Sequence, residues 1–208
     1  MVGRPCGRAW GAGLVVALSV GGCVTAAPPQ PIVSPSGIVY EPGTPPEETR
    51  RSQTATLYFR QQRAERALEL SLEGLEVDPE NPIHYFLAGV AHARLGQYGE
   101  ADRMFSEAQA IYPAYEIDIE PQRRAAWAEA FNAGVEAYGT GETEEALEAW
   151  GNAAVIYDLR PEAHRNLASL LAVEGRHDEA IEIYRRALDG LEKRPATLVL
   201  DEDRKSVV

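Results

Sequence analysis

The sequence is poor in cysteine and lysine, and it lacks a long uninterrupted apolar run. Its only cysteines are Cys6 and Cys23, too few for a disulfide framework or a four-cysteine metal site. Its 20 cationic residues face 32 acids, which gives a formal charge of −12, and no basic cluster stands out. Because nucleic-acid binding needs Lys and Arg gathered against phosphates, this composition argues against a nucleic-acid partner.

Motifs for catalysis are also missing. The sequence has no Gly-x-Ser-x-Gly and no glycine-rich phosphate loop after a strand. The acid run from Gly141 to Glu148 lies at a predicted helix start, where glutamate stabilises the positive end of the helix dipole. We therefore expect a non-enzymatic protein with no metal and no cofactor. The histidines lack zinc-ligand spacing and are predicted to be ordinary surface or half-buried residues: His84, His92, His164 and His177.

The N-terminus has the pattern of a cleaved signal. The first 22 residues contain no acid, carry Arg4 and Arg8, and include an apolar run from Ala12 to Val20. A membrane-spanning helix needs about 20 apolar residues, far more than this run provides. The sequence therefore predicts a signal peptide over residues 1–22 and not a transmembrane anchor.

Cysteine follows the small residues at once, as "VGGC" (Val20–Cys23). This resembles the lipobox of bacterial lipoproteins, and the alternative is a stray cysteine at the end of an ordinary signal. The resemblance implies that Cys23 receives diacylglyceryl and acyl chains, while Cys6 leaves with the signal. Several chains anchor durably because each buried methylene contributes about 0.8 kcal/mol. The absence of Asp at Val24 resembles lipoproteins of the outer membrane, which implies a lipid-anchored protein of the cell envelope that faces the periplasm.

A proline-rich segment follows Cys23. It has seven prolines between Val24 and Thr49 and no apolar periodicity, so residues 23–47 are predicted to be the acylated cysteine and a disordered tether. Fully extended as polyproline II, such a tether would reach roughly 80 Å. A spacer is the favoured role, and recognition of the prolines is the alternative. The run Thr44 to Glu47 is predicted to form a capping box at the start of the folded part.

Four alanines mark an internal repeat after Thr49. They lie at intervals of 34, 45 and 34 residues: Ala67, Ala101, Ala146 and Ala180. The same register places Ser71, Phe105, Trp150 and Tyr184 four residues after the alanines, and Gly96, Gly141 and Gly175 five residues before the last three. A repeat of this length is typical of stacked helix pairs.

The copy from Asn81 to Pro113 has the most specific pattern. Its matching residues are Tyr85, Gly89, Gly96, Tyr98, Ala101, Phe105, Ala108 and Pro113. It resembles the tetratricopeptide repeat (TPR), which implies an all-α array of about four helix pairs, an α-solenoid, over residues 48–194. The repeats would span about 48–81, 82–115, 127–160 and 161–194, with a tail at 195–208. In the first copy Gln62 stands where the turn glycine would be.

An insertion at 116–126 separates the second and third copies. Pro121 is predicted to begin a longer helix, which leaves Ala114 to Glu120 as an irregular bridge and kinks the superhelix. Insertions in repeat arrays often form binding faces, and a tolerated spacer is the alternative.

The resemblance also implies a binding groove, because in this family the first helix of each pair lines a concave surface that holds a peptide or helix. Five of the implied residues, Phe86, Val90, Phe131, Val135 and Tyr138, are expected to form one partly exposed apolar strip. The complete set is Phe59, Arg60, Phe86, Val90, Arg94, Phe131, Val135, Tyr138, Arg165 and Ser169. The Lys and Asn constellation with which some relatives grip a C-terminal carboxylate is absent.

Two functions follow from these patterns. The first is a lipoprotein scaffold that binds another protein in the envelope, in assembly of an outer-membrane, secretion or pilus complex. The second is a structural lipoprotein that dimerises through its last helix, which has no later helix to cover its apolar side chains. Those side chains are Ile181, Ile183, Tyr184, Leu188 and Leu191. The tail "ATLVLDEDRKSVV" (Ala196–Val208) could cover part of that surface.

Overall fold

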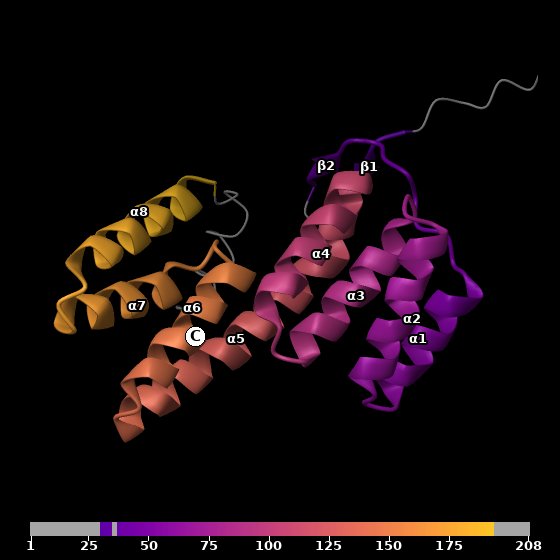
Figure 1. Cartoon of the computed structure of the whole chain (residues 1–208). Coiled ribbons are helices and arrows are strands. Elements are labelled where there is room, and N and C mark those ends of the chain that lie inside the picture. Colours follow the sequence, from indigo (N-terminus) through magenta and orange to yellow (C-terminus); the bar gives the residue numbers. More distant parts are fainter. Residues whose placement is uncertain (1–29, 35–36, 194–208) are drawn as a thin grey trace, which may run out of the picture.

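Residues 30–34 and 37–193 are described by a computed structural model of the chain. The predicted signal peptide, Cys23 and the tail after residue 194 lie outside these residues. Eight α-helices follow one another in four pairs, which confirms the all-α array (Figure 1). The helices are α1 (Arg50–Arg60), α2 (Ala64–Val77), α3 (Pro82–Arg94), α4 (Tyr98–Ile111), α5 (Glu116–Thr140), α6 (Thr143–Ile156), α7 (Pro161–Val173) and α8 (His177–Lys193).

Local sequence explains several helix ends. Asn81 caps α3 by accepting a hydrogen bond from the Ile83 N–H, with Pro82 in the first turn as predicted. Gly96, Gly141 and Gly175 have φ of 73°, 84° and 79°, the left-handed conformation that favours glycine. Between α1 and α2, Gln62 takes this conformation, with φ of 57°.

The array begins later than the predicted capping box. Thr49, not Thr44, caps α1, and the box is completed by Ser52. The prediction for Thr44 to Glu47 was therefore wrong, because the residue that faces the first free N–H groups lies five positions further on.

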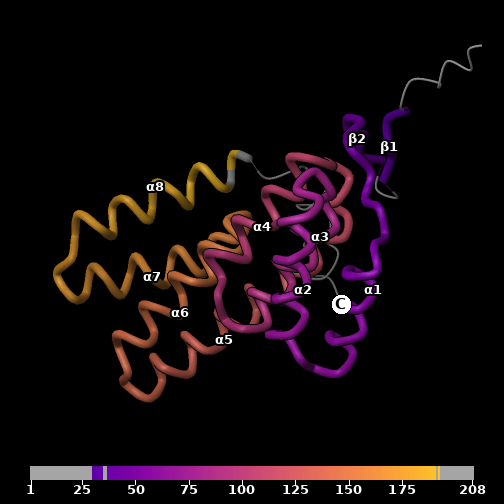
Figure 2. The backbone as a smooth tube through the Cα atoms, turned by 45° about the vertical axis from the view of Figure 1, so that its right-hand side comes forward, coloured from indigo at the N-terminus to yellow at the C-terminus, as the bar shows by residue number. Residues whose placement is uncertain are grey.

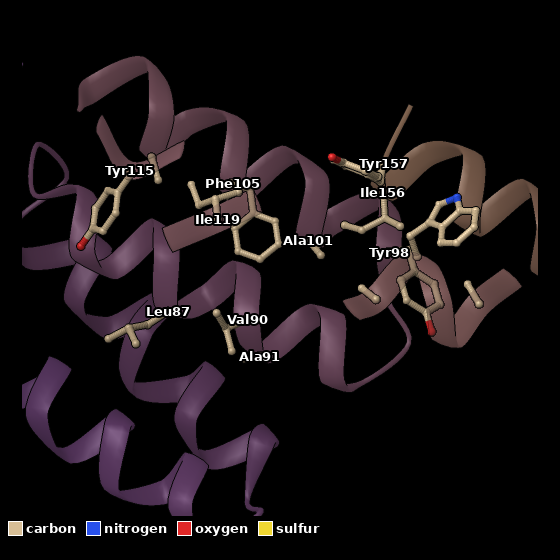
Figure 3. Close-up of a cluster of buried hydrophobic side chains, with 14 of the residues drawn as sticks. Leu87, Val90, Ala91, Tyr98, Ala101, Phe105, Tyr115, Ile119, Ile156 and Tyr157 are labelled. Atoms are coloured by element: carbon tan, nitrogen blue, oxygen red, sulfur yellow. The ribbon is translucent and has the colours of Figure 1, made fainter. Parts of the chain in front are cut away.

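Small residues let the paired helices approach closely. A Cβ atom on Gly89 would lie 2.6 Å from the Phe105 ring, and one on Gly134 would lie 2.5 Å from the Trp150 ring. Ala101 is fully buried beside Phe105 in a cluster that Figure 3 shows in part. One core cluster joins α1–α5 to the end of α6, and a second joins the end of α5 to α6, α7 and α8.

The insertion forms helix, not an irregular bridge. A short 3₁₀ turn, η1 (Pro113–Tyr115), leads directly into α5, and Pro121 lies inside this 25-residue helix. Proline in a helix costs about 3 kcal/mol, but full burial of Ile119 returns about 1.5–3 kcal/mol. Tyr115 adds a stacked contact with Phe86 at 5.0 Å between ring centroids. Tertiary packing therefore overrides the proline.

Packing changes at the insertion. Between successive pairs, α2 packs on α3 and α6 packs on α7, but α4 contacts α6 more extensively than it contacts α5. Figures 1 and 2 both show α1–α4 as one group and α5–α8 as another, with α5 leading between them. Across the described helices, none is long and apolar enough to cross a bilayer.

Part of the predicted tether is packed. A hairpin of β1 (Ile32–Val33) and β2 (Val39–Tyr40) precedes a strap, residues 41–49, that lies against the array. The Thr44 N–H donates to the Ile111 carbonyl at 3.0 Å. Glu47 and Asn81 exchange two hydrogen bonds, at 3.1 and 2.9 Å. The prediction of a disordered tether was therefore wrong for this stretch, since backbone pairing with distant helices has no periodic signal.

Candidate partner-binding groove

In the first half of the array, several predicted groove residues belong to the core. Val90 is 7% exposed and Phe59 is 9% exposed. Phe86 is half-buried, because it stacks on Tyr115 of η1, just before the insertion. The prediction of one exposed strip was therefore wrong here: η1 supplies an aromatic ring that covers the position a partner would use.

The predicted arginines are exposed but do not gather. Arg94 lies over the Phe59 ring at 4.9 Å and donates to the Phe59 carbonyl at 3.1 Å. This contact ties α3 to α1. Arg60 and Arg165 are exposed on α1 and α7, in separate halves of the array. Only Arg165 shares a helix with residues of the hollow described next.

The second half has an open apolar hollow between α5 and α7. It has a volume of about 340 Å³ and includes three predicted residues: Val135, Tyr138 and Ser169. Val135 is 48% exposed and Tyr138 is 60% exposed, which is unusual for large apolar side chains in a cavity. The complete lining is Val135, Tyr138, Trp150, Asn166, Ser169, Leu170 and Val173. We refer to this set as the α5–α7 hollow.

Trp150 and Gly134 fix the floor of the hollow. Trp150 is 4% exposed and lies against Gly134, where any side chain would collide with the indole ring. This close approach holds α6 against α5 and leaves the ring beneath Tyr138, at 5.6 Å between centroids. The floor is therefore rigid, while the rim residues Tyr138 and Val173 project into solvent.

Phe131 lies on α5 between the α5–α7 hollow and the first half of the array. It stacks on Trp127 at 4.8 Å with an interplanar angle of 12°, and Arg160 covers the other part of that indole at 4.7 Å. Phe131 packs against both core clusters. It is half-buried and acts as a joint between the clusters, so the predicted strip is interrupted at this point.

Sequence reasoning missed Val173, which is 80% exposed and the most exposed large apolar side chain among those described. It lies four residues after Ser169, so the helical spacing already applied to Ser169 would have found it. Asn166 and Ser169 supply the polar atoms of the hollow. The Ser169 and Tyr184 hydroxyls lie 3.1 Å apart, which ties the hollow to α8.

The insertion forms a second, polar hollow of about 350 Å³. Arg123 reaches across it to Asp102 and donates to the Ile156 carbonyl, which joins α4, α5 and α6. The Tyr157 hydroxyl donates to Glu120 at 3.0 Å, and burial raises the pKa of Tyr157 to about 12. The contacts of Arg123 and Glu120 hold the insertion against α4 and the end of α6.

The histidines lie deeper than predicted. His84 and His164 are 1% and 3% exposed, His92 is 9% exposed, and only His177 is exposed. Burial lowers the pKa of His84 and His164, which keeps both rings neutral at pH 7. Within the described residues, no group of three acids, histidines or cysteines could hold a metal ion.

Among the comparisons with known proteins, the match to a repeat profile agrees with this architecture. No curated protein matches the sequence significantly. A crystal structure of MamA is 20% identical, with 69% of this chain and 77% of that chain covered and a TM-score of 0.31. A MamA structure from residue 41 onward, from Desulfovibrio magneticus RS-1, is 18% identical, with 72% and 100% covered and a TM-score of 0.31. The sequence profile of the tetratricopeptide repeat matches residues 53–116 and 131–195, more than half of the sequence, and the chain therefore belongs to the tetratricopeptide repeat family.

Proposed function

We propose that this chain is a non-enzymatic scaffold that binds a partner protein in the α5–α7 hollow. The observation that carries the proposal is the exposure of Val135, Tyr138 and Val173, at 48%, 60% and 80%, around a buried floor. Three large apolar side chains held in water at the rim of a cavity are typical of a surface that is covered in a complex.

The hollow suits an apolar side chain from a helix or an extended peptide. Trp150 and Leu170 offer a flat apolar floor, and the side chains of Asn166 and Ser169 offer donors and acceptors at one wall. A partner would place one or two anchors on the floor and form hydrogen bonds at that wall. No charged residue lines the hollow, so we expect the partner's anchor to be uncharged.

We further propose that the scaffold works in the cell envelope, attached to the outer membrane and facing the periplasm. The support is the sequence "VGGC" after a short apolar run. Diacylglyceryl and acyl chains on Cys23 would anchor the protein, and its partner would belong to an outer-membrane, secretion or pilus assembly. Replacement of Cys23 by Ser should abolish labelling by a palmitate analogue, and equal labelling of both forms would refute the lipid anchor.

Binding in the hollow is tested by Tyr138→Glu with Val173→Glu, in native envelopes after chemical cross-linking. The double variant should lose the partners recovered with the wild type and keep its melting temperature, since both side chains are exposed. A matched control is Leu72→Glu with Val77→Glu, two exposed apolar residues of α2 at 40% and 67%. Recovery of the same partners by the hollow variant, or equal loss in the control, would show that binding lies elsewhere.

Self-association is a second candidate function, because α8 exposes Ile181, Tyr184 and Leu188 at 49%, 43% and 61%. Two copies could bury these side chains against each other. Sedimentation of the wild type and of Tyr184→Glu with Leu188→Glu distinguishes this function. A dimer that the double variant converts to a monomer supports it, and a wild-type monomer across the micromolar range excludes it.

A further inference from the structure

The last helix pair exposes a face that the earlier pairs bury. Four residues after the repeat alanine, Ser71 and Phe105 are 0% exposed and Trp150 is 4% exposed, but Tyr184 is 43% exposed. Ile181 and Leu188, one helical turn to either side of Tyr184, are 49% and 61% exposed. We refer to these three residues of α8 as the end face.

In the inner repeats, the following helices cover this position. Phe105 belongs to a cluster with Ile119 of α5, as Figure 3 shows, and Trp150 belongs to one with Leu167 of α7. In the part of the chain that the structure describes, no element follows α8. A helix-pair array needs a different, polar surface at its ends, so a bare repeat face at this end is an incomplete core.

We propose that residues Ala196–Leu200 of the same chain cover the end face in place of a further helix. This stretch, "ATLVL", is apolar and begins three residues after the end of α8. Pro195 stands before it, and proline lacks the N–H that would continue the helix. The segment can then run back along α8.

The lengths agree with this path. Leu188 and Ile181 are seven residues apart on α8, which is roughly 10 Å at 1.5 Å per residue. The end of α8 at Lys193 lies roughly 18 Å from Ile181 along the helix, and the seven residues 194–200 span roughly 23 Å when extended, enough to turn and run back along this length. Alternate side chains of the segment, Thr197 and Val199 or Leu198 and Leu200, would lie on the helix.

The charges of the tail and of the last helix pair also support a tail that runs back along α8. Asp201, Glu202 and Asp203 follow the apolar stretch. Arg185 lies between Tyr184 and Leu188 in the sequence of α8, and Arg165 lies one turn before Ser169, whose hydroxyl meets Tyr184. Both arginines are exposed, and neither forms an ion pair with a described residue. Acids that follow the apolar stretch would meet these two cations.

The inference is independent of the α5–α7 hollow, but it competes with self-association for one surface. If the tail covers the end face, a second copy cannot. The experiment must therefore distinguish a contact within one chain from a contact between two.

A disulfide trap makes this distinction, because cysteines join only when their Cα atoms come within about 7 Å. Two versions of the full chain, with Cys6 and Cys23 replaced by Ser, carry Tyr184→Cys with Val199→Cys or with Leu198→Cys, so that both faces of the extended segment are tested. Their controls carry Val77→Cys in place of Tyr184→Cys, since Val77 is 67% exposed on α2. Under mild oxidation, one of the two Tyr184→Cys versions should form a monomeric disulfide at least about ten times faster than its control. Equal rates, or a dimeric disulfide in Tyr184→Cys alone, would overturn the proposal.

Two further measurements test the contacts. Leu198→Ser with Val199→Ser and Leu200→Ser should lower the melting temperature by about 3 °C or more, while Val207→Ser with Val208→Ser should not. Arg185→Glu should slow the trap, and Asp201→Arg with Asp203→Arg should restore its rate. An unchanged melting temperature in the triple variant would count against a docked tail. So would a rate of disulfide formation that neither charge reversal changes.

Discussion

The close approach of α5 and α6 at Gly134 makes a prediction that reverses the usual effect of a glycine substitution. In a helix interior, Ala is normally better than Gly by about 0.5–1 kcal/mol. At Gly134, however, a Cβ atom would lie 2.5 Å from the Trp150 ring. Real Cβ atoms do not approach this closely, so the indole or the helix must move.

The expected net loss for Gly134→Ala is about 1–2 kcal/mol. Overpacking a dense core costs about 1–3 kcal/mol, and the gain in helix propensity offsets only part of this. Gly151→Ala is the matched control, because this glycine lies inside α6 with nothing within 4 Å of the new methyl group. The control should gain about 0.5–1 kcal/mol.

Thermal melts followed by circular dichroism measure both variants in the full chain. At about 2–4 °C per kcal/mol for a domain of this size, the two melting temperatures should move in opposite directions by several degrees. Because Trp150 forms the floor of the α5–α7 hollow, Gly134→Ala should also weaken partner recovery. If Gly134→Ala melts at or above the wild-type temperature, the proposed contact between Gly134 and Trp150 is refuted.

Two other predictions concern Gln62 in the first repeat and His84 in the second. Gln62→Gly should stabilise the chain by about 1 kcal/mol, because Gln62 has a φ of 57°, which strains a residue with a side chain. The control Gln61→Gly, at a φ of −90°, should not stabilise it. Equal melting temperatures for the two variants would refute the strain at Gln62. Burial lowers the pKa of His84, so the unfolded chain takes up its proton first, at an ordinary pKa of about 6.5. Stability from this residue should therefore be complete above that pH and decline as the pH falls below it, towards the depressed pKa of the folded state. Urea unfolding between pH 7.5 and 5.5 should show a smaller decline in His84→Gln, and an identical decline would exclude this histidine as a cause.

Features set by neighbouring residues could be predicted from the sequence. The cap at Asn81 and Pro82 needs only a side chain and an N–H two residues on, and both are visible in the sequence. The glycine at 141 and the acids that follow it mark the start of α6 in the same local way. The close pairs Gly89 with Phe105 and Gly134 with Trp150 were also accessible, because the repeat register fixes which residues face each other.

Features set by distant residues could not be predicted. Phe86 occupies a groove position in the repeat register, but the ring of Tyr115, just before the insertion, stacks on it and covers it. The helical state of residues 116–120 depends on the burial of Ile119 and on the contact between Tyr115 and Phe86, which together offset the cost of Pro121. The strap depends on a hydrogen bond from Thr44 to Ile111, across 67 positions of sequence. Neither periodicity nor composition reports such contacts.

The strap and the insertion together change how the scaffold would be presented at a membrane. With residues 41–49 held against the array and the hairpin from Ile32 before them, only residues 24–31 lie between Cys23 and the hairpin. Those 8 residues would reach roughly 25 Å in polyproline II geometry, about a third of the reach expected from the sequence. The insertion meanwhile closes the groove in the half that carries the strap and leaves the open hollow between α5 and α7. If Cys23 carries the lipid, the half of the array that is tied to the membrane is closed to partners, and binding is confined to the half that extends away from the strap.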